Sequence, residues 1–474
     1  MRRWIMGAGA LLLLLFFGGK VFISGEGKTL FTEVLDSYNR ARTGLKLELD
    51  EYRGDWRGAQ ARIRVVPEAG ENALPPGVRR PLELNFSVTY GPWFFSPMGP
   101  GLLRIESRGS FSRWLRDDAK EAFLKAVPSD VGYRYLGVMD WWHVMHETIA
   151  LTRIEAYDSR TREKVILEPL RIRSDYYPAT LKGRAEFSSD GLTLLDGKRG
   201  ERLELQKPRL EAEVREFNTT GPLFGRVRFS VAEVRALLKR PDPESLRFGI
   251  SAEMDLKRRS PLLADLTLKS EAKALNETTR KAWKGLVESR GTLRLEGLGI
   301  AGIRKLEAME RERRRLRREL AKTVGAGDDI GMQKAILALQ ALDDGWIDAY
   351  NTLLIPGQTR LVLDERFRGE KESRLQLDLT FTGRKLPKDP FSAMVALTTE
   401  MNRLVEGQFD LQMEEKLLGR LFPEAKLILD SMVQKGLATL QEGIYRLKGS
   451  IEKGKIVING TRYAPQELIM MILI

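Results

Sequence analysis

Short runs in which apolar and charged residues alternate recur along most of this chain of 474 residues. Residues 45–50 read Leu-Lys-Leu-Glu-Leu-Asp, and residues 62–65 read Arg-Ile-Arg-Val after the turn-like Arg53-Gly54-Asp55. Successive side chains of a strand point to opposite faces, so these runs predict a hairpin of strands with one apolar face. Antiparallel sheets covered on one face have this pattern. Similar runs lie at residues 82–88, 103–105, 203–205, 227–231, 246–250, 293–295, 375–381, 409–413 and 456–458.

Helical spacing of apolar residues is concentrated in the second half of the chain. It predicts helices at 303–322, 333–354, 390–400 and 424–441, and an earlier helix at 28–42. We therefore expect an α+β fold: an N-terminal transmembrane helix, then a β-rich body of mainly antiparallel sheet over residues 44–300, with helices concentrated in the C-terminal part. In the run at 375–381, Leu377 and Leu379 should be buried, whereas Gln376 and Asp378 should face solvent or a groove.

The N-terminus carries the clearest indication of cellular location. Residues 4–23 form an apolar stretch of about 20 residues, the length that a helix needs to cross a hydrocarbon core of about 30 Å. A cleaved secretory signal is the alternative, but it requires small residues before the cut, and bulky residues follow the leucine block in every register. We predict an uncleaved anchor, whose main apolar residues are Trp4, Leu11, Leu12, Leu13, Leu14, Leu15, Phe16 and Phe17.

The charges around this anchor predict its orientation. Arg2 and Arg3 precede it and place the N-terminus in the cytoplasm by the positive-inside rule. The body would then lie in the periplasm of a bacterium, held at the inner membrane by a single span. Three regions are expected: the anchor at 1–27, a β-rich region at 28–300 and a mixed helix and strand region at 301–474.

Composition excludes several kinds of chemistry. The chain has no cysteine, which removes disulfides, thiolate nucleophiles and iron–sulfur clusters and agrees with an oxidising compartment. The formal net charge of +13 suits a basic surface beside anionic lipid head groups. We expect no nucleic-acid partner, because the basic residues accompany no recognisable nucleic-acid-binding element.

Both histidines lie in residues 141–147, Trp-Trp-His-Val-Met-His-Glu. On a helix, His143 and His146 would share a face and could bind a metal beside Glu147, whereas on a strand they would point to opposite sides. The neighbouring aromatic and β-branched residues favour a strand. We therefore expect structural residues here and no metal site.

Other candidate chemistry is weaker. Asp343, Asp344 and Asp348 could form an acid pair on the predicted helix 333–354, but acids one turn apart are common on solvated helix faces. The glycine-rich residues 325–331 follow a helix rather than a strand and are predicted to be a linker, not a phosphate loop. The sequence contains no serine nucleophile elbow, so we expect no catalytic residues and no cofactor.

A dense cluster of arginines lies in the predicted helix 303–322. It consists of Arg311, Arg313, Arg314, Arg315, Arg317 and Arg318, and Glu310, Glu312 and Glu319 offset the repulsion only in part. A packed helix with a solvated basic face is the simpler interpretation. The other is contact with an anionic surface, for which the candidates are Arg311, Arg314, Arg315, Arg317 and Arg318.

Two turns and the C-terminal end resemble a known family. Tyr52-Arg53-Gly54-Asp55-Trp56 is a bend between alternating strands, and the turn Tyr90-Gly91-Pro92-Trp93-Phe94 follows it. Residues 454–460, Gly-Lys-Ile-Val-Ile-Asn-Gly, form a strand and an Asn-Gly turn before a short amphipathic end with Pro465, Glu467, Leu468 and Ile469. In this order, behind one N-terminal anchor, the chain resembles the YdgA-like family of Gram-negative inner-membrane proteins of unknown function. The resemblance implies a periplasmic body on a single anchor and supplies no catalytic residue.

These features lead us to expect a non-enzymatic envelope protein whose anchored body binds another envelope protein or an acyl lipid. A curved sheet lined with Leu, Ile, Val and Phe could hold acyl chains. The alternative is an anchored periplasmic hydrolase, which would require two carboxylates that face each other about 5 to 10 Å apart in a cleft.

Overall fold

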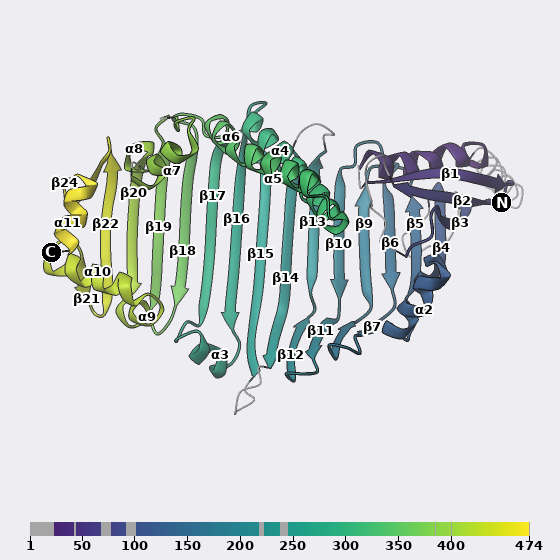
Figure 1. Ribbon diagram of the computed structural model, residues 1–474, viewed down its shortest axis with the longest axis horizontal. Helices are drawn as coiled ribbons and strands as arrows, with labels where there is room; N and C mark the ends of the chain where they lie inside the picture. Colours follow the sequence, from purple (N-terminus) through teal and green to yellow (C-terminus); the bar gives the residue numbers. More distant parts are fainter. Residues whose placement is uncertain are drawn as a thin grey trace, which may run out of the picture. The chain divides into compact units, whose positions relative to one another are not determined.

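The computed structural model describes residues 23–41, 44–67, 77–91, 101–217, 222–237, 245–383, 385–399 and 401–473 (Figure 1). The chain divides into two compact units. Unit 1 comprises Met1–Thr219 and Gly225–Leu246, and unit 2 comprises Thr220–Phe224 and Arg247–Ile474. The predicted border at residue 300 falls inside unit 2, between β17 (Glu288–Gly299) and α4 (Ile300–Ala326).

The predicted anchor lies outside the described residues, except for its last residue, Ile23. Ile23 is buried in the core of unit 1. The helix predicted at 28–42 is present, and its described part covers residues 23–40. Within the described ranges, no helix is both long enough and apolar enough to cross a membrane.

The described strands of unit 1 form two antiparallel series of neighbours, which we call ladders and which belong to one sheet. In the first, each strand pairs with the next in the order β1 (Leu45–Gly54), β2 (Gly58–Pro67), β3 (Leu82–Tyr90), β4 (Leu103–Ser110), β5 (Gly132–Met139), β6 (Met145–Leu151), β9 (Leu170–Tyr176), β10 (Gly183–Ser189) and β13 (Arg209–Glu216). The second contains β7 (Ile154–Tyr157), β8 (Glu163–Leu167), β11 (Gly191–Asp196), β12 (Glu201–Gln206) and β14 (Phe224–Leu237). The predicted hairpin is confirmed as β1 and β2.

One face of the first ladder carries the core of unit 1. Apolar residues at helical spacing place Phe31, Val34 and Leu35 on one side of helix 23–40. They pack with Ile63 of β2 and Ile105 of β4, among other buried side chains. In Figure 1 this helix is purple and runs beside β1. The helix therefore covers part of the apolar face of the ladder.

Two short elements interrupt unit 1 after β4. They are the 3-10 helix η1 (Phe111–Trp114) and α2 (Asp117–Ala126). Neither was predicted. None of the α2 residues is buried.

Unit 2 contains a third antiparallel ladder, drawn from teal to yellow in Figure 1. Its strands pair in the order β15 (Ser245–Arg258), β16 (Leu263–Ala274), β17, β18 (Arg360–Arg368), β19 (Glu372–Phe381), β20 (Val405–Glu414), β22 (Ile444–Glu452), β23 (Lys455–Ile458) and β24 (Thr461–Tyr463). A short β21 (Thr439–Gln441) also pairs with β22.

The helices of unit 2 follow the predictions in outline. Besides α4 they are α3 (Glu277–Ala282), α5 (Asp329–Asp344), α6 (Trp346–Leu353), α7 (Pro390–Thr399), α8 (Met401–Leu404), α9 (Glu415–Leu421), α10 (Pro423–Gln434) and α11 (Pro465–Leu473). The helix at 390–400 is confirmed as α7, and 303–322 lies within α4. Two boundaries were wrong. The segment 333–354 breaks at Gly345 into α5 and α6, and the last predicted helix ends at Gln434, before a turn at Gly436 with a φ of 69°.

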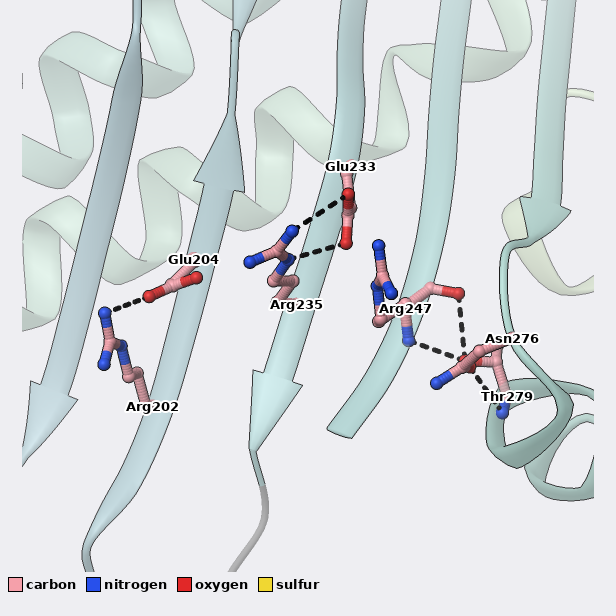
Figure 2. A network of polar contacts seen from close by, with 7 residues as sticks. All are labelled: Arg202, Glu204, Glu233, Arg235, Arg247, Asn276 and Thr279. Carbon is pink, nitrogen blue, oxygen red and sulfur yellow. Dashed lines mark hydrogen bonds and ion pairs between the residues drawn. The ribbon is translucent and has the colours of Figure 1, made fainter. Parts of the chain in front are cut away.

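Ion pairs line the polar faces of the ladders. Figure 2 shows Arg202 paired with Glu204 on β12, and Arg235 paired with Glu233 on β14 at 2.6 Å. The register places Glu204 opposite Arg235, so charges of opposite sign alternate across this face. Ion pairs of this kind mark the polar face of these strands.

A polar contact holds α3 at the end of β15 in unit 2. The Thr279 hydroxyl accepts a hydrogen bond from the Arg247 amide at 2.6 Å and lies 3.0 Å from the Arg247 carbonyl oxygen (Figure 2). The Asn276 side chain accepts a hydrogen bond from the Thr279 amide, as an N-cap does.

The prediction that Leu377 and Leu379 are buried overstated the extent of their burial. The period-two pattern is correct, because residues 372–381 form β19. Both leucines, however, are only half-buried, whereas Ser373 and Phe381 near the strand ends are buried. The alternation specifies which face is apolar, but it does not specify whether anything covers that face.

Candidate functional site

Unit 1 contains a half-open apolar cavity of about 380 Å³ between helix 23–40, η1 and strands β1–β6. This volume lies in the range of small-molecule sites, about 300 to 1,000 Å³. No lining side chain of this cavity, all of them in the described part of the chain, is charged. The lining residues are Phe31, Val34, Leu35, Tyr38, Leu45, Leu47, Ile63, Val65, Leu82, Leu84, Phe86, Ile105, Ser107, Phe111, Trp114, Tyr133, Tyr135, Ile149 and Leu151.

The cavity forms because helix 23–40 covers only part of the apolar face of the sheet. The roof side chains, Phe31, Val34 and Leu35, are buried. Those on the floor beyond the helix, such as Leu82, Leu84 and Phe86 of β3, are only half-buried, whereas their neighbours Glu83 and Asn85 on the other face are exposed. The helix is too narrow to cover the whole apolar face. The remaining part keeps open volume against leucines and aromatic rings.

A buried carboxyl lies behind one wall of the cavity. The Glu147 Oε1 atom accepts hydrogen bonds from the hydroxyls of Tyr38 at 2.6 Å, Tyr135 at 2.8 Å and Tyr176 at 3.2 Å. The Ser174 hydroxyl donates to Oε2 at 2.9 Å. We call these five residues the Glu147 cluster. Tyr38 comes from helix 23–40, whereas the others come from β5, β6 and β9, so the cluster joins the roof of the cavity to its floor.

Burial raises the pKa of the Glu147 carboxyl, and the four hydroxyl donors oppose that shift. Burial also raises the pKa of Tyr38 and of Tyr135, so both phenols stay protonated and donate. Sequence reasoning missed this cluster. Glu147 was considered only beside the two histidines, and Tyr38 lies 109 residues away along the chain.

The two histidines do not form a metal site with Glu147. His143 lies in a turn with a φ of 56°, and its Nδ1 is 3.8 Å from a carboxylate oxygen of Glu33. His146 is on β6, as the strand prediction required, with Nδ1 2.6 Å from Asp175 and Nε2 3.3 Å from Asp140. Burial opposes charging of His146, but these carboxylates raise its pKa overall. Among the residues with described positions, no group of His, Asp and Glu could hold a metal ion.

The predicted acid pair is not assembled on one helix. Asp344 is the last residue of α5, Gly345 separates the two helices, and Asp348 lies in α6. Asp348 is exposed and pairs with Lys305 at 2.6 Å. It therefore serves as a surface ion pair, while the side chains of Asp343 and Asp344 are outside the described set.

The arginine cluster lies on α4, and its five candidate contact residues are all exposed: Arg311, Arg314, Arg315, Arg317 and Arg318. Carboxylates neutralise part of the cluster. Arg314 lies 3.2 Å from Glu310, and Arg315 pairs with both Glu312 and Glu319 at 2.5 Å and 2.7 Å. Leu316 is buried on the opposite side of the helix. The basic face is therefore presented to the surroundings of unit 2.

Comparison with known proteins adds no relative, since no family model, no curated protein and no solved structure matches the chain.

The Glu147 cluster should stabilise unit 1. Tyr38→Phe removes one hydrogen bond to the carboxyl and should lower the free energy of unfolding by about 1 to 2 kcal/mol. Glu147→Ala leaves several buried hydroxyls without an acceptor and should lower it by at least about 3 kcal/mol. Urea unfolding of both variants checks this order, with exposed Glu83→Ala as the matched control. Equal, small effects of all three variants would contradict a role of the cluster in holding the helix.

Proposed function

We propose that unit 1 binds the hydrocarbon chain of a lipid in its apolar cavity. The observation that carries this proposal is an open volume lined by leucines, isoleucines and aromatic rings with no charged side chain. A ligand there would gain by removing apolar surface from water, at about 25 cal/mol per Å². The hydroxyls of Tyr38 and Tyr135 are already committed to Glu147, which leaves them poor partners for a polar ligand.

A carboxylate hydrolase receives less support from this site. Glu147 is a single acid behind the cavity wall, its oxygens accept four hydroxyl hydrogen bonds, and the described residues that line the cavity include no carboxylate. The arrangement does not provide the two facing acids that such an enzyme needs. We therefore propose a binding protein rather than an enzyme.

We also propose that the chain is held in a bacterial inner membrane by residues 4–23, with its body in the periplasm. Support comes from the length of the apolar stretch, from Arg2 and Arg3 before it, and from the resemblance to the YdgA-like family. Helix 23–40 continues directly from this stretch and forms the roof of the cavity. An anchor there would bring the cavity close to its source of lipid.

A second candidate function is binding to an anionic surface through α4. The five exposed arginines support it, because an anionic membrane attracts each nearby cation by about 1 kcal/mol. An acidic envelope protein would present similar chemistry. The simpler alternative is a solvated face, since exposed ion pairs with Glu310, Glu312 and Glu319 contribute little to stability.

Photolabelling tests the cavity. The full chain is reconstituted in phosphatidylcholine vesicles with a palmitic acid analogue that carries a diazirine in its chain. We expect adducts on peptides from β3, β5 and β6. Leu84→Trp fills the cavity and should lower these adducts about tenfold. Glu83→Trp places the same ring on the exposed face of β3 and should leave them unchanged. Absence of adducts on these peptides, or equal labelling of both variants, would overturn the proposed function.

The anchor and its orientation can be tested together. N-terminal sequencing of the membrane-extracted protein should begin before residue 4, and alkaline phosphatase fused after Ile474 should be active in the periplasm. A new N-terminus after residue 20 would show that the segment is a cleaved signal. Activity of a cytoplasmic reporter alone at the same site would reverse the orientation.

Because the chain has no cysteine, a single introduced cysteine allows a fluorophore to be attached at one known position for a test of the arginine cluster. A single cysteine replaces exposed Ala308 on α4 and carries a fluorescent donor, with acceptors on vesicle head groups. Energy transfer should be stronger in vesicles containing phosphatidylglycerol than in neutral ones and should decrease with salt. Replacing Arg314, Arg315, Arg317 and Arg318 with Gln should remove the difference without lowering the melting temperature. No dependence on lipid charge in the parent chain would favour the solvated face.

A further inference from the structure

The apolar face of unit 2 contains eight leucines in strict cross-strand register. Residues directly opposite each other in antiparallel strands lie on the same face. Leu268 is opposite Leu293, Leu293 opposite Leu363, and Leu363 opposite Leu377. A second row runs through Leu266, Leu295, Leu361 and Leu379. We call these two rows, which cross β16 to β19, the leucine ribbon.

The helices that the structure describes in unit 2 do not bury the ribbon completely. All eight leucines are half-buried, and none belongs to the buried cores. At one end of the strands, Phe381 packs with Ile347 of α6 and Ala393 of α7. At the other end, Phe367 and Met413 pack with residues of α9 and α10, including Leu418 and Leu429. These helices therefore border the ribbon at both ends of the strands, and the leucines between them stay only half-buried.

The dimensions of the ribbon suit a hydrocarbon chain. Its apolar rows continue to Met254 and Leu256 on β15 and to Phe409 on β20. Five strand spacings of about 4.8 Å give a length of about 24 Å. One leaflet of a hydrocarbon core, about 15 Å thick, fits within that length. The two rows are about 7 Å apart, which is narrower than the roughly 10 Å diameter of a helix.

The chemistry of the ribbon also favours a chain without polar groups. The backbone of β16 to β19 is paired on both sides, so an extended peptide would find no free ladder for its own backbone groups. The opposite face is charged, with pairs such as Arg374 and Asp364 at 2.8 Å. A contiguous apolar surface of this kind marks a site of interaction.

Charge on the neighbouring helix indicates the class of lipid. Ile300, at the start of α4, packs on Ala264 and Leu256 at the border of the ribbon. From there α4 carries nine Arg and Lys residues against four Glu residues. An anionic head group would be attracted toward this helix, whereas a neutral one would not.

We propose that the leucine ribbon of unit 2 is a second lipid site, which holds an acyl chain of an anionic phospholipid across β16 to β19. This site is separate from the cavity of unit 1 and does not depend on it. It explains why eight leucines are only half-buried on a face whose ends the helices of the same unit cover.

The test uses the full chain in phosphatidylcholine vesicles that contain phosphatidylglycerol with a diazirine in one acyl chain. We expect adducts on the tryptic peptide 375–384, which carries Leu377 and Leu379, and on 361–366. The double variant Leu363→Gln, Leu377→Gln places two amides in the ribbon and should lower these adducts about tenfold. Val362→Gln adds one amide on the opposite face of β18 and should leave them unchanged.

A further variant and further probes distinguish the possible outcomes. Should the double variant unfold, Leu377→Trp fills the ribbon and should lower the same adducts. A phosphatidylcholine probe with the same chain should label 375–384 less than the phosphatidylglycerol probe, and equal labelling would overturn the preference for an anionic lipid. Absence of adducts on 361–366 and 375–384, with labelling of β3, β5 and β6 intact, would overturn this site and leave the cavity standing. If photoleucine in the segments 361–366 and 375–384 crosslinked only to another polypeptide, the occupant of the ribbon would be a protein and not a lipid.

Discussion

The rest of the structure depends on one constraint: each sheet is apolar on one face only, and that face must be kept from water. A strand cannot turn its side chains over without a shift of register, so every leucine of an alternating run is committed to the same side. Helices cover only part of these faces. In unit 1 the cover is helix 23–40, and in unit 2 it is α6 and α7 at one end of the strands and α9 to α11 at the other. The cavity and the leucine ribbon are the apolar surface that remains.

The Glu147 cluster shows how unit 1 tolerates incomplete cover. A helix that lies on a sheet through apolar contacts alone could shift until the cavity closed. Tyr38 fixes the helix instead, because its hydroxyl reaches a buried carboxyl that three other hydroxyls also hold. A buried acid is costly without such partners. The cluster therefore holds the roof at a set distance from the floor while the side chains between them stay apolar.

Local patterns in the sequence were sufficient for much of this fold. The alternation at 45–66 predicted β1 and β2, and the run at 375–381 predicted β19, because period two depends only on neighbouring residues. Helix α7 was predicted with nearly its observed bounds. The positions at which helices end were harder to predict. Gly345 separates α5 from α6 and Gly436 follows α10, yet each glycine alone resembles one that a helix tolerates.

The candidate site depends on contacts that no local pattern contains. Tyr38 and Glu147 meet across 109 residues, and the sequence around Glu147 pointed instead to the two histidines, which pair with carboxylates of their own. Leu377 and Leu379 were expected to be buried, but they are only half-buried. Alternation identifies the apolar face of a strand and does not show whether other residues cover that face. That difference is the observation from which the second lipid site is proposed.

Native mass spectrometry of the full chain, extracted from membranes in a mild detergent, tests most directly whether hydrocarbon fills these surfaces. After the detergent is removed in the gas phase, the folded chain should retain bound molecules with the masses of acyl lipids, including anionic phospholipids. A folded chain that appears at its bare mass, with no retained lipid under conditions that preserve other lipid complexes, would contradict both sites.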